Sequence, residues 1–201
     1  TSLLLIGNIS DYTVDGYSTL TALYVQYNDV LTELSDVLML SALTTFAAGG
    51  LPQVGVALDL SSNAALTYMQ YVNVPLLTSI PSTAPNTLLE YYYLDSLPLI
   101  TTLPAVSSNL ALTSYQLASL ELLEDVPDLS LNVSLETLWL LGLPLITSVQ
   151  SMVTNTALKN YSLGALDLVS SVPALTANTA LENVSISGVA LLTTLPDFPT
   201  S

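Results

Sequence analysis

The sequence contains no cysteine, no histidine and no arginine, and Lys159 is its single basic side chain. The lack of cysteine excludes disulfides, a thiol nucleophile and a zinc–thiolate site. With 16 acidic residues the formal net charge is -15. This charge excludes a nucleic-acid partner, because phosphate binding needs a basic footprint. An anionic membrane surface would repel the chain for the same reason.

Charged residues of either sign are scarce. They make up 8% of the chain, against 51% hydrophobic residues, so Ser, Thr and Asn must supply most of the surface polarity. A membrane-spanning helix needs about 20 predominantly apolar residues. Even the long uncharged run 37–58 is interrupted by Ser, Thr, Gly, Pro and Gln. We therefore expect no membrane insertion.

What the chain does contain is a repeat. From residue 63 onward it divides into six blocks of 23 residues, and every block opens with asparagine. A fixed period of about 20 to 30 residues indicates a solenoid, in which each unit buries its apolar face against its neighbours. The six opening residues are Asn63, Asn86, Asn109, Asn132, Asn155 and Asn178.

Within a block, the apolar positions predict a short strand followed by a return path. If the asparagine is position one, position four is leucine in every block, and positions seven and nine are mostly apolar or aromatic. The two-residue spacing places positions seven and nine on one face of a strand. Proline recurs at positions thirteen and nineteen and prevents a regular helix there. The return path should therefore be extended or form a short 3₁₀ turn.

The same pattern continues towards the N-terminus, where the repeat motif is less regular. Residues 63–200 are six regular repeats, residues 17–62 are two degenerate repeats, and residues 1–16 are a partial first unit. Because 201 residues suffice for one continuous core, we predict a single domain over residues 1–201.

Two segments carry the repeat motif most clearly. Leu135-Glu-Thr-Leu138-Trp-Leu140 has the form L-x-x-L-x-L, and Leu97-Pro-Leu-Ile-Thr-Thr-Leu-Pro104 forms the second half of a unit. This pattern resembles the leucine-rich-repeat family. The resemblance implies an α/β-type leucine-rich-repeat solenoid, with a parallel β-sheet on the concave face, mostly irregular or 3₁₀ return segments, and little α-helix.

The sequence departs from the family at one position. Leucine or valine stands where related units carry Cys or Asn, the polar residue that hydrogen-bonds neighbouring turns in the family. The asparagine at position one is the predicted replacement, since a stacked column of amides can form a ladder between coils. The preference of asparagine for turns with positive φ explains each residue singly, and both readings are structural.

The even strand positions should point away from the core, onto the concave face, where the family commonly binds partners. Tyr and Trp are enriched among the residues that contribute most to binding, although strand propensity also favours aromatics here. Acidic residues beside the aromatics would suit a basic or carbohydrate partner. The predicted ligand-binding residues are Tyr68, Tyr91, Tyr93, Trp139, Glu90, Glu136, Gln70 and Gln116.

Four Asn-x-Ser sequences match the acceptor pattern for N-glycosylation and mildly favour secretion. They begin at Asn8, Asn132, Asn160 and Asn183. Glycans on the last two would block that end of the concave face for any other ligand.

Chemistry at a catalytic centre is not expected. The chain has neither His nor Cys to activate a nucleophile, and a shallow solenoid aligns no two carboxylates across a cleft as a glycosidase requires. One repeat carries four acidic residues on its return side, and a solvent-exposed acidic edge is a better interpretation of them than a calcium site. They are Glu121, Glu124, Asp125 and Asp128. We predict no catalytic residue, metal site or cofactor.

The leading interpretation is a non-enzymatic binding module, extracellular or surface-exposed, whose concave aromatic and acidic surface meets a protein or a glycan. The alternative is a structural building block of a surface layer, fibre or particle shell. Such a block would assemble through uncapped ends or flanks, or the repeat array would continue.

Overall fold

In the part of the chain that the structure describes, nine strands form one parallel sheet in which the strand order follows the chain order. The computed structural model describes residues 1–7, 18–34 and 40–200. Tyr68 on one strand lies opposite Tyr91 on the next, so one 23-residue block makes one coil. The strands are β1 (Ser2–Ile6), β2 (Ala22–Gln26), β3 (Thr45–Gly49), β4 (Tyr68–Val72), β5 (Tyr91–Asp95), β6 (Ser114–Ala118), β7 (Thr137–Leu141), β8 (Asn160–Gly164) and β9 (Asn183–Ser187).

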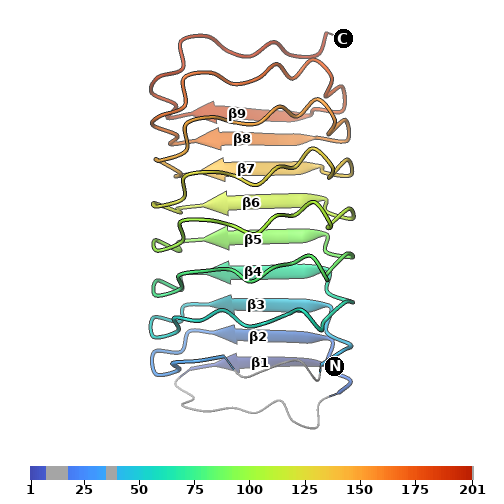
Figure 1. The fold of residues 1–201 in the computed structure, drawn as a ribbon, viewed down its shortest axis with the longest axis vertical. Helices are drawn as coiled ribbons and strands as arrows, with labels where there is room; N and C mark the ends of the chain where they lie inside the picture. The colour runs from blue at the N-terminus through green and yellow to red at the C-terminus, as the bar shows by residue number, and fades with distance from the viewer. Residues whose placement is uncertain (8–17, 35–39, 201) are drawn as a thin grey trace.

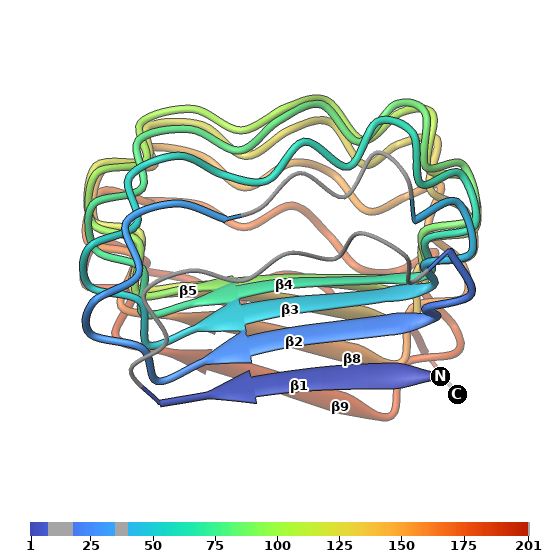
Figure 2. The same cartoon turned by 90° about the horizontal axis from the view of Figure 1, so that it is seen from below.

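The return segments run back on the opposite side of the coil from the sheet. Figure 1 shows the strands stacked in one direction, and Figure 2 shows the return segments facing them across the core. The sheet is arched, with β4 and β5 displaced towards the side on which the return segments lie and β1 and β9 displaced away from it (Figure 2). The face of the sheet that points away from the return segments is therefore concave.

The return segments are built from turns. In one coil the N–H of Leu77 donates to the oxygen of Val74 at 3.1 Å, and the N–H of Asn86 donates to the oxygen of Thr83 at 2.9 Å. Neither an α-helix nor a 3₁₀-helix occurs in the described part of the chain. The predicted parallel sheet with little helix is confirmed, and of the two predicted forms of return segment the irregular one is found. In the same described part, no helix is long and apolar enough to cross a membrane.

Alternation along each strand separates the core from the concave face. In β4 the side chains of Met69 and Tyr71 are fully buried, while Tyr68 and Gln70 between them are half-buried. The buried side chains of adjacent coils merge into one cluster that runs from Leu20 to Leu175. Because a strand has a period of two, this core fixes which side chains reach the open face.

The asparagines at position one join adjacent coils. Nδ2 of Asn86 donates to the main-chain oxygens of Asn63 and Leu60, both at 2.9 Å. The same pair of bonds recurs in the four later coils, and all six position-one asparagines are fully buried. A buried polar group without a partner costs about 1–3 kcal/mol. The five amides from Asn86 onward therefore each stabilise two carbonyls of the preceding coil, and the Asn63 amide donates to the oxygen of Leu40 at 2.8 Å.

The residue after each strand adopts a left-handed turn. Gly50, Gly142 and Gly188 occupy this position with φ near +63°, and Asn73 and Ala165 adopt it as well, at 53° and 50°. The turn aims the main-chain N–H at the next coil, as when the N–H of Asn73 donates to the oxygen of Asp95 at 2.9 Å. Turn and strand together keep successive coils in register.

Candidate functional site

A cluster of three tyrosines lies on the concave face. Tyr68 and Tyr91 are opposite each other in β4 and β5, and their rings stack with centroids 4.6 Å apart and an interplanar angle of 3°. Tyr93, two residues further along β5, meets Tyr91 edge to face at 6.5 Å. We call Tyr68, Tyr91 and Tyr93 the tyrosine cluster. Stacked and edge-to-face rings are the favoured geometries for aromatic pairs, so these residues hold one another in place.

Hydrogen bonds to neighbours fix the hydroxyl ends of two of these rings. The hydroxyl of Tyr68 donates to Oε1 of Gln70, and the hydroxyl of Tyr93 donates to Oδ2 of Asp95 at 3.1 Å. In both cases the partner is two residues along the same strand and thus on the same face. The cluster presents ring faces and anchored hydroxyls in one fixed arrangement.

The tyrosines of the cluster are held neutral. Burial raises the pKa of Tyr68 and of Tyr91, although the hydrogen bond with Gln116 acts in the opposite direction on Tyr91. Burial and the carboxylate of Asp95 raise the pKa of Tyr93 to about 12. At neutral pH each hydroxyl therefore keeps its proton and remains a hydrogen-bond donor.

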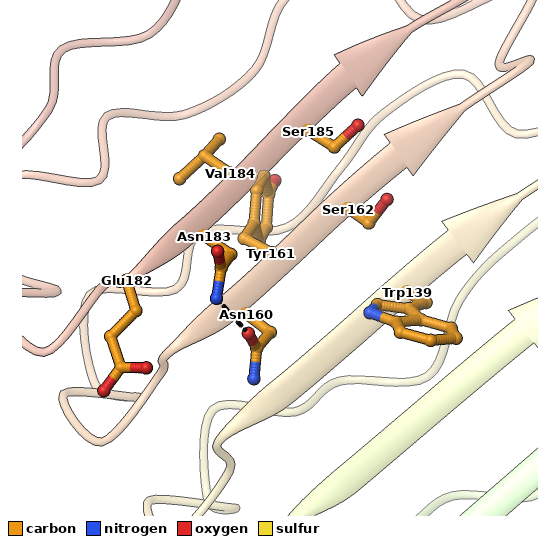
Figure 3. A pocket seen from close by; sticks show the side chains of 8 residues that line it. All are labelled: Trp139, Asn160, Tyr161, Ser162, Glu182, Asn183, Val184 and Ser185. Atoms are coloured by element: carbon orange, nitrogen blue, oxygen red, sulfur yellow. Dashed lines mark hydrogen bonds between the residues drawn. The ribbon is translucent and has the colours of Figure 1, made fainter.

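A hollow of about 500 Å³ opens on the same face towards the C-terminal end of the sheet. Figure 3 shows Trp139 on β7 at one side, with Asn160 and Ser162 on β8 and Asn183 and Ser185 on β9 across from it. We call this site the Trp139 hollow. Glu182, Tyr161 and Val184 complete its lining.

The polar side of the Trp139 hollow is ordered by an amide chain. Nδ2 of Asn183 donates to Oδ1 of Asn160 at 2.9 Å, and Nδ2 of Asn160 donates to Oγ1 of Thr137 at 3.2 Å. The register of β7, β8 and β9 places these three residues opposite one another. The chain fixes the direction in which each amide presents its donor and acceptor.

Charged side chains stand immediately before the strands in several coils. Nζ of Lys159 lies 2.9 Å from Oε1 of Glu136, an ion pair whose two side chains are 40% and 44% exposed. Because both side chains stay exposed to solvent, such a pair contributes little to stability. Glu90 and Glu182 occupy the equivalent position of other coils and are exposed. Among the described residues, no three His, Cys, Asp or Glu side chains gather as a metal site.

A comparison with solved structures finds a protein of similar fold. A protein described as "Functional domain of InlJ from Listeria monocytogenes includes a cysteine ladder" matches 89% of this chain with a TM-score of 0.61 and 24% identity. That neighbour is a leucine-rich-repeat protein. By fold, this chain is a leucine-rich-repeat solenoid. It spans 42% of the neighbour's length. No protein-family model matches the sequence, and no curated protein matches it.

The neighbour's title names a cysteine ladder, whereas this solenoid has no cysteine. Its coils are joined instead by the column of buried asparagines. In the coil of Asn109, its Nδ2 donates to the main-chain oxygens of Asn86 and Thr83. Its Oδ1 accepts a hydrogen bond from the Thr83 hydroxyl at 2.9 Å.

The structure divides the predicted ligand-binding residues into two groups. Tyr68, Gln70, Tyr91 and Tyr93 come together, while Trp139 lies two strands away in its own hollow. Gln116 stands between the two groups but is 6% exposed, and its Nε2 donates to Oγ of Ser114 at 2.8 Å. Its position is that of a support for Tyr91 rather than of an exposed contact. The predicted acidic neighbours, Glu90 and Glu136, lie immediately before β5 and β7 and are exposed.

The glycosylation pattern needs one correction. Asn132 is fully buried, and its Nδ2 donates to the oxygens of Asn109 and Val106 at 2.8 and 3.1 Å. A glycan would replace one of the two hydrogens on that nitrogen and so remove at least one of these bonds, and the fully buried side chain leaves no room for a sugar, so Asn132 is a structural residue. Asn8 lies outside the described residues.

Sequence reasoning missed two features of the site. Asp95 was not selected, although it is two residues from Tyr93 and so shares its face. The Trp139 hollow was also missed. Its signal is a change in side-chain size along one column, from Trp139 to Ser162 and Ser185, which pair in register.

Proposed function

We propose that this solenoid is a non-enzymatic binding module that presents its concave face to a protein or glycan partner. The observation that carries the proposal is the tyrosine cluster. Its three rings are packed against one another on the open face and are half-buried. Rigid tyrosines contribute contact area at a low entropic cost and are frequent at the centres of interfaces.

The surroundings of the cluster favour a partner with basic or hydroxyl-rich groups. Asp95 lies beside Tyr93, and the exposed Glu90 lies immediately before the same strand. The net charge of -15 adds a long-range field that attracts cations. An extracellular or surface location remains a prediction of the sequence.

A test uses arrays of basic peptides and of oligosaccharides, probed with the labelled protein. The Tyr91→Ser/Tyr93→Ser/Trp139→Ser variant removes the exposed rings. It should lose the spots that the wild type binds. Tyr27→Ser is the matched control, because Tyr27 is 70% exposed but lies on a turn with φ of 53°, where Ser96 shows that serine is accepted. Unchanged binding by the triple variant would refute the proposal.

A second function, lateral assembly into a layer or fibre, is favoured by a different observation. Position fourteen is an exposed leucine in six successive coils, between 38% and 51% exposed. Because the coils repeat in register, these leucines follow one another from coil to coil as an apolar column, and exposed apolar residues that gather in this way are typical of interaction surfaces. The column consists of Leu76, Leu99, Leu122, Leu145, Leu168 and Leu191.

Sedimentation over a range of protein concentrations separates the two functions. Assembly through the leucine column predicts growth with concentration that Leu122→Ser/Leu145→Ser abolishes. A binding module predicts a monomer at every concentration.

A further inference from the structure

We propose that the Trp139 hollow binds a neutral saccharide. The assignment rests on the proposed binding function of the concave face and names the ligand class for one part of it. It is carried by the residues that line the hollow and by the chemistry they share.

The hollow arises from a step in side-chain size. Trp139 projects from β7, and the next two residues in its column are Ser162 and Ser185. The small serines leave the indole exposed along its side, at 40% of its surface. The indole of Trp139 thus lies beside the polar side chains of the two following strands (Figure 3).

A sugar ring matches this surface on both counts. It has a face of C–H groups that packs on an aromatic ring, and a rim of hydroxyls that both donate and accept hydrogen bonds. The indole supplies the first contact and a donor of its own. The Asn160 and Asn183 amides and the two serine hydroxyls supply donors and acceptors for the second. The amide chain to Thr137 pre-orders them, which lowers the cost of binding.

The charges around the hollow favour a neutral ligand over an anionic one. Glu182 lines the hollow, and the nearby Lys159 is engaged by Glu136 at 2.9 Å. The net charge of -15 repels sulfated, phosphorylated or carboxylated sugars. The composition also distinguishes the hollow from the tyrosine cluster, because serine is depleted at the cores of protein–protein interfaces whereas tyrosine is enriched.

The single tryptophan of the chain gives a direct readout. Protein made in bacteria, where Asn160 and Asn183 stay unmodified, is titrated with neutral oligosaccharides of glucose, galactose, mannose and N-acetylglucosamine. At least one should change the Trp139 emission saturably, with a shift to shorter wavelength. Asn160→Ala/Asn183→Ala should weaken that binding roughly tenfold or more, since two hydrogen-bonding groups are lost.

Two controls accompany the titration. Asn73→Ser alters an exposed asparagine on a turn outside the hollow and should leave the affinity within twofold. Trp139→Phe, followed by calorimetry, should retain weaker binding because an aromatic face remains. Equal unfolding midpoints for all variants exclude loss of the fold as the cause.

The saccharide assignment fails if no neutral sugar gives a saturable change, if the double alanine variant binds as tightly as the wild type, or if acidic sugars bind better than neutral ones. The proposed function is judged separately, by basic peptides whose binding depends on Tyr91 and Tyr93. If peptides bind and sugars do not, only the saccharide assignment is overturned. If neither binds, both are.

Discussion

The asparagine at position one is the residue on which the stacking of coils depends most directly. We predict that Asn132→Ala lowers the free energy of unfolding by about 2–4 kcal/mol, because the oxygens of Asn109 and Val106 lose their buried donor. Urea denaturation measures the loss. The exposed Asn73→Ser should change it by less than about 0.5 kcal/mol. A comparable loss at both positions would contradict a structural ladder.

Buried tyrosine hydroxyls predict a loss of stability at alkaline pH. Burial raises the pKa of Tyr92, Tyr115 and Tyr161 above the ordinary tyrosine value of 10.0. As pH rises above 10.0, the unfolded chain releases these protons while the folded chain keeps them, so stability falls. Urea midpoints at neutral pH and at increasing alkaline pH should decrease accordingly.

Tyr92→Phe tests the cause. The Tyr92 hydroxyl is buried without a hydrogen-bond partner in the described structure, so its removal should cost little at neutral pH. The variant should lose less stability than the wild type in alkali. An equal alkaline loss would show that this hydroxyl does not contribute.

At the residue scale, the sequence predicts the outward position of an aromatic but not its neighbours in space. Period-two alternation places Tyr68, Tyr91 and Tyr93 on one face. Gln116 is buried because large side chains flank it on the adjacent strands. A pattern of polar and apolar residues along the sequence does not predict such contacts between strands. Asn132 matches a glycosylation pattern, and only packing identifies it as a ladder residue.

At the scale of the single coil, the turn after each strand sets a backbone requirement. We predict that Ala165→Gly raises the free energy of unfolding by about 0.5–1 kcal/mol. The φ of 50° strains alanine, and Gly50 and Gly142 occupy the equivalent turns. Thermal unfolding measures the gain. Ala157→Gly, where no positive φ occurs, should be destabilising instead. A loss in Ala165→Gly would contradict the assigned strain.

The coil is also the scale at which the sequence is most informative. The spacing of Leu66, Met69, Tyr71 and Val74 predicts a strand and a bend from residue periodicity alone, and the structure has them. The sequence does not decide between an extended and a 3₁₀ return segment, because proline excludes a helix without choosing among the alternatives. In the structure the return segments are built from turns, such as those closed by the N–H groups of Leu77 and Asn86.

For the whole molecule, stacking of equal coils predicts tolerance to the loss of one. Deletion of residues 109–131 removes one 23-residue block and brings Asn132 next to Asn86 in the ladder. We expect the shortened chain to keep its β-type circular dichroism and unfold cooperatively at a lower urea concentration, since each coil contacts mainly its neighbours. Deletion of residues 109–120 breaks the register and should prevent folding. Equal behaviour of the two deletions would contradict the model of stacked coils.

Whether a partner binds the concave face is tested by amide chemical-shift mapping with NMR. The labelled protein is titrated with the oligosaccharide or basic peptide that binds most strongly on the arrays. Binding on the concave face predicts that the largest shifts lie in β4 to β9, with the single indole N–H of Trp139 among them for a sugar. Largest shifts along the leucine column instead, with the strands unchanged, would contradict it.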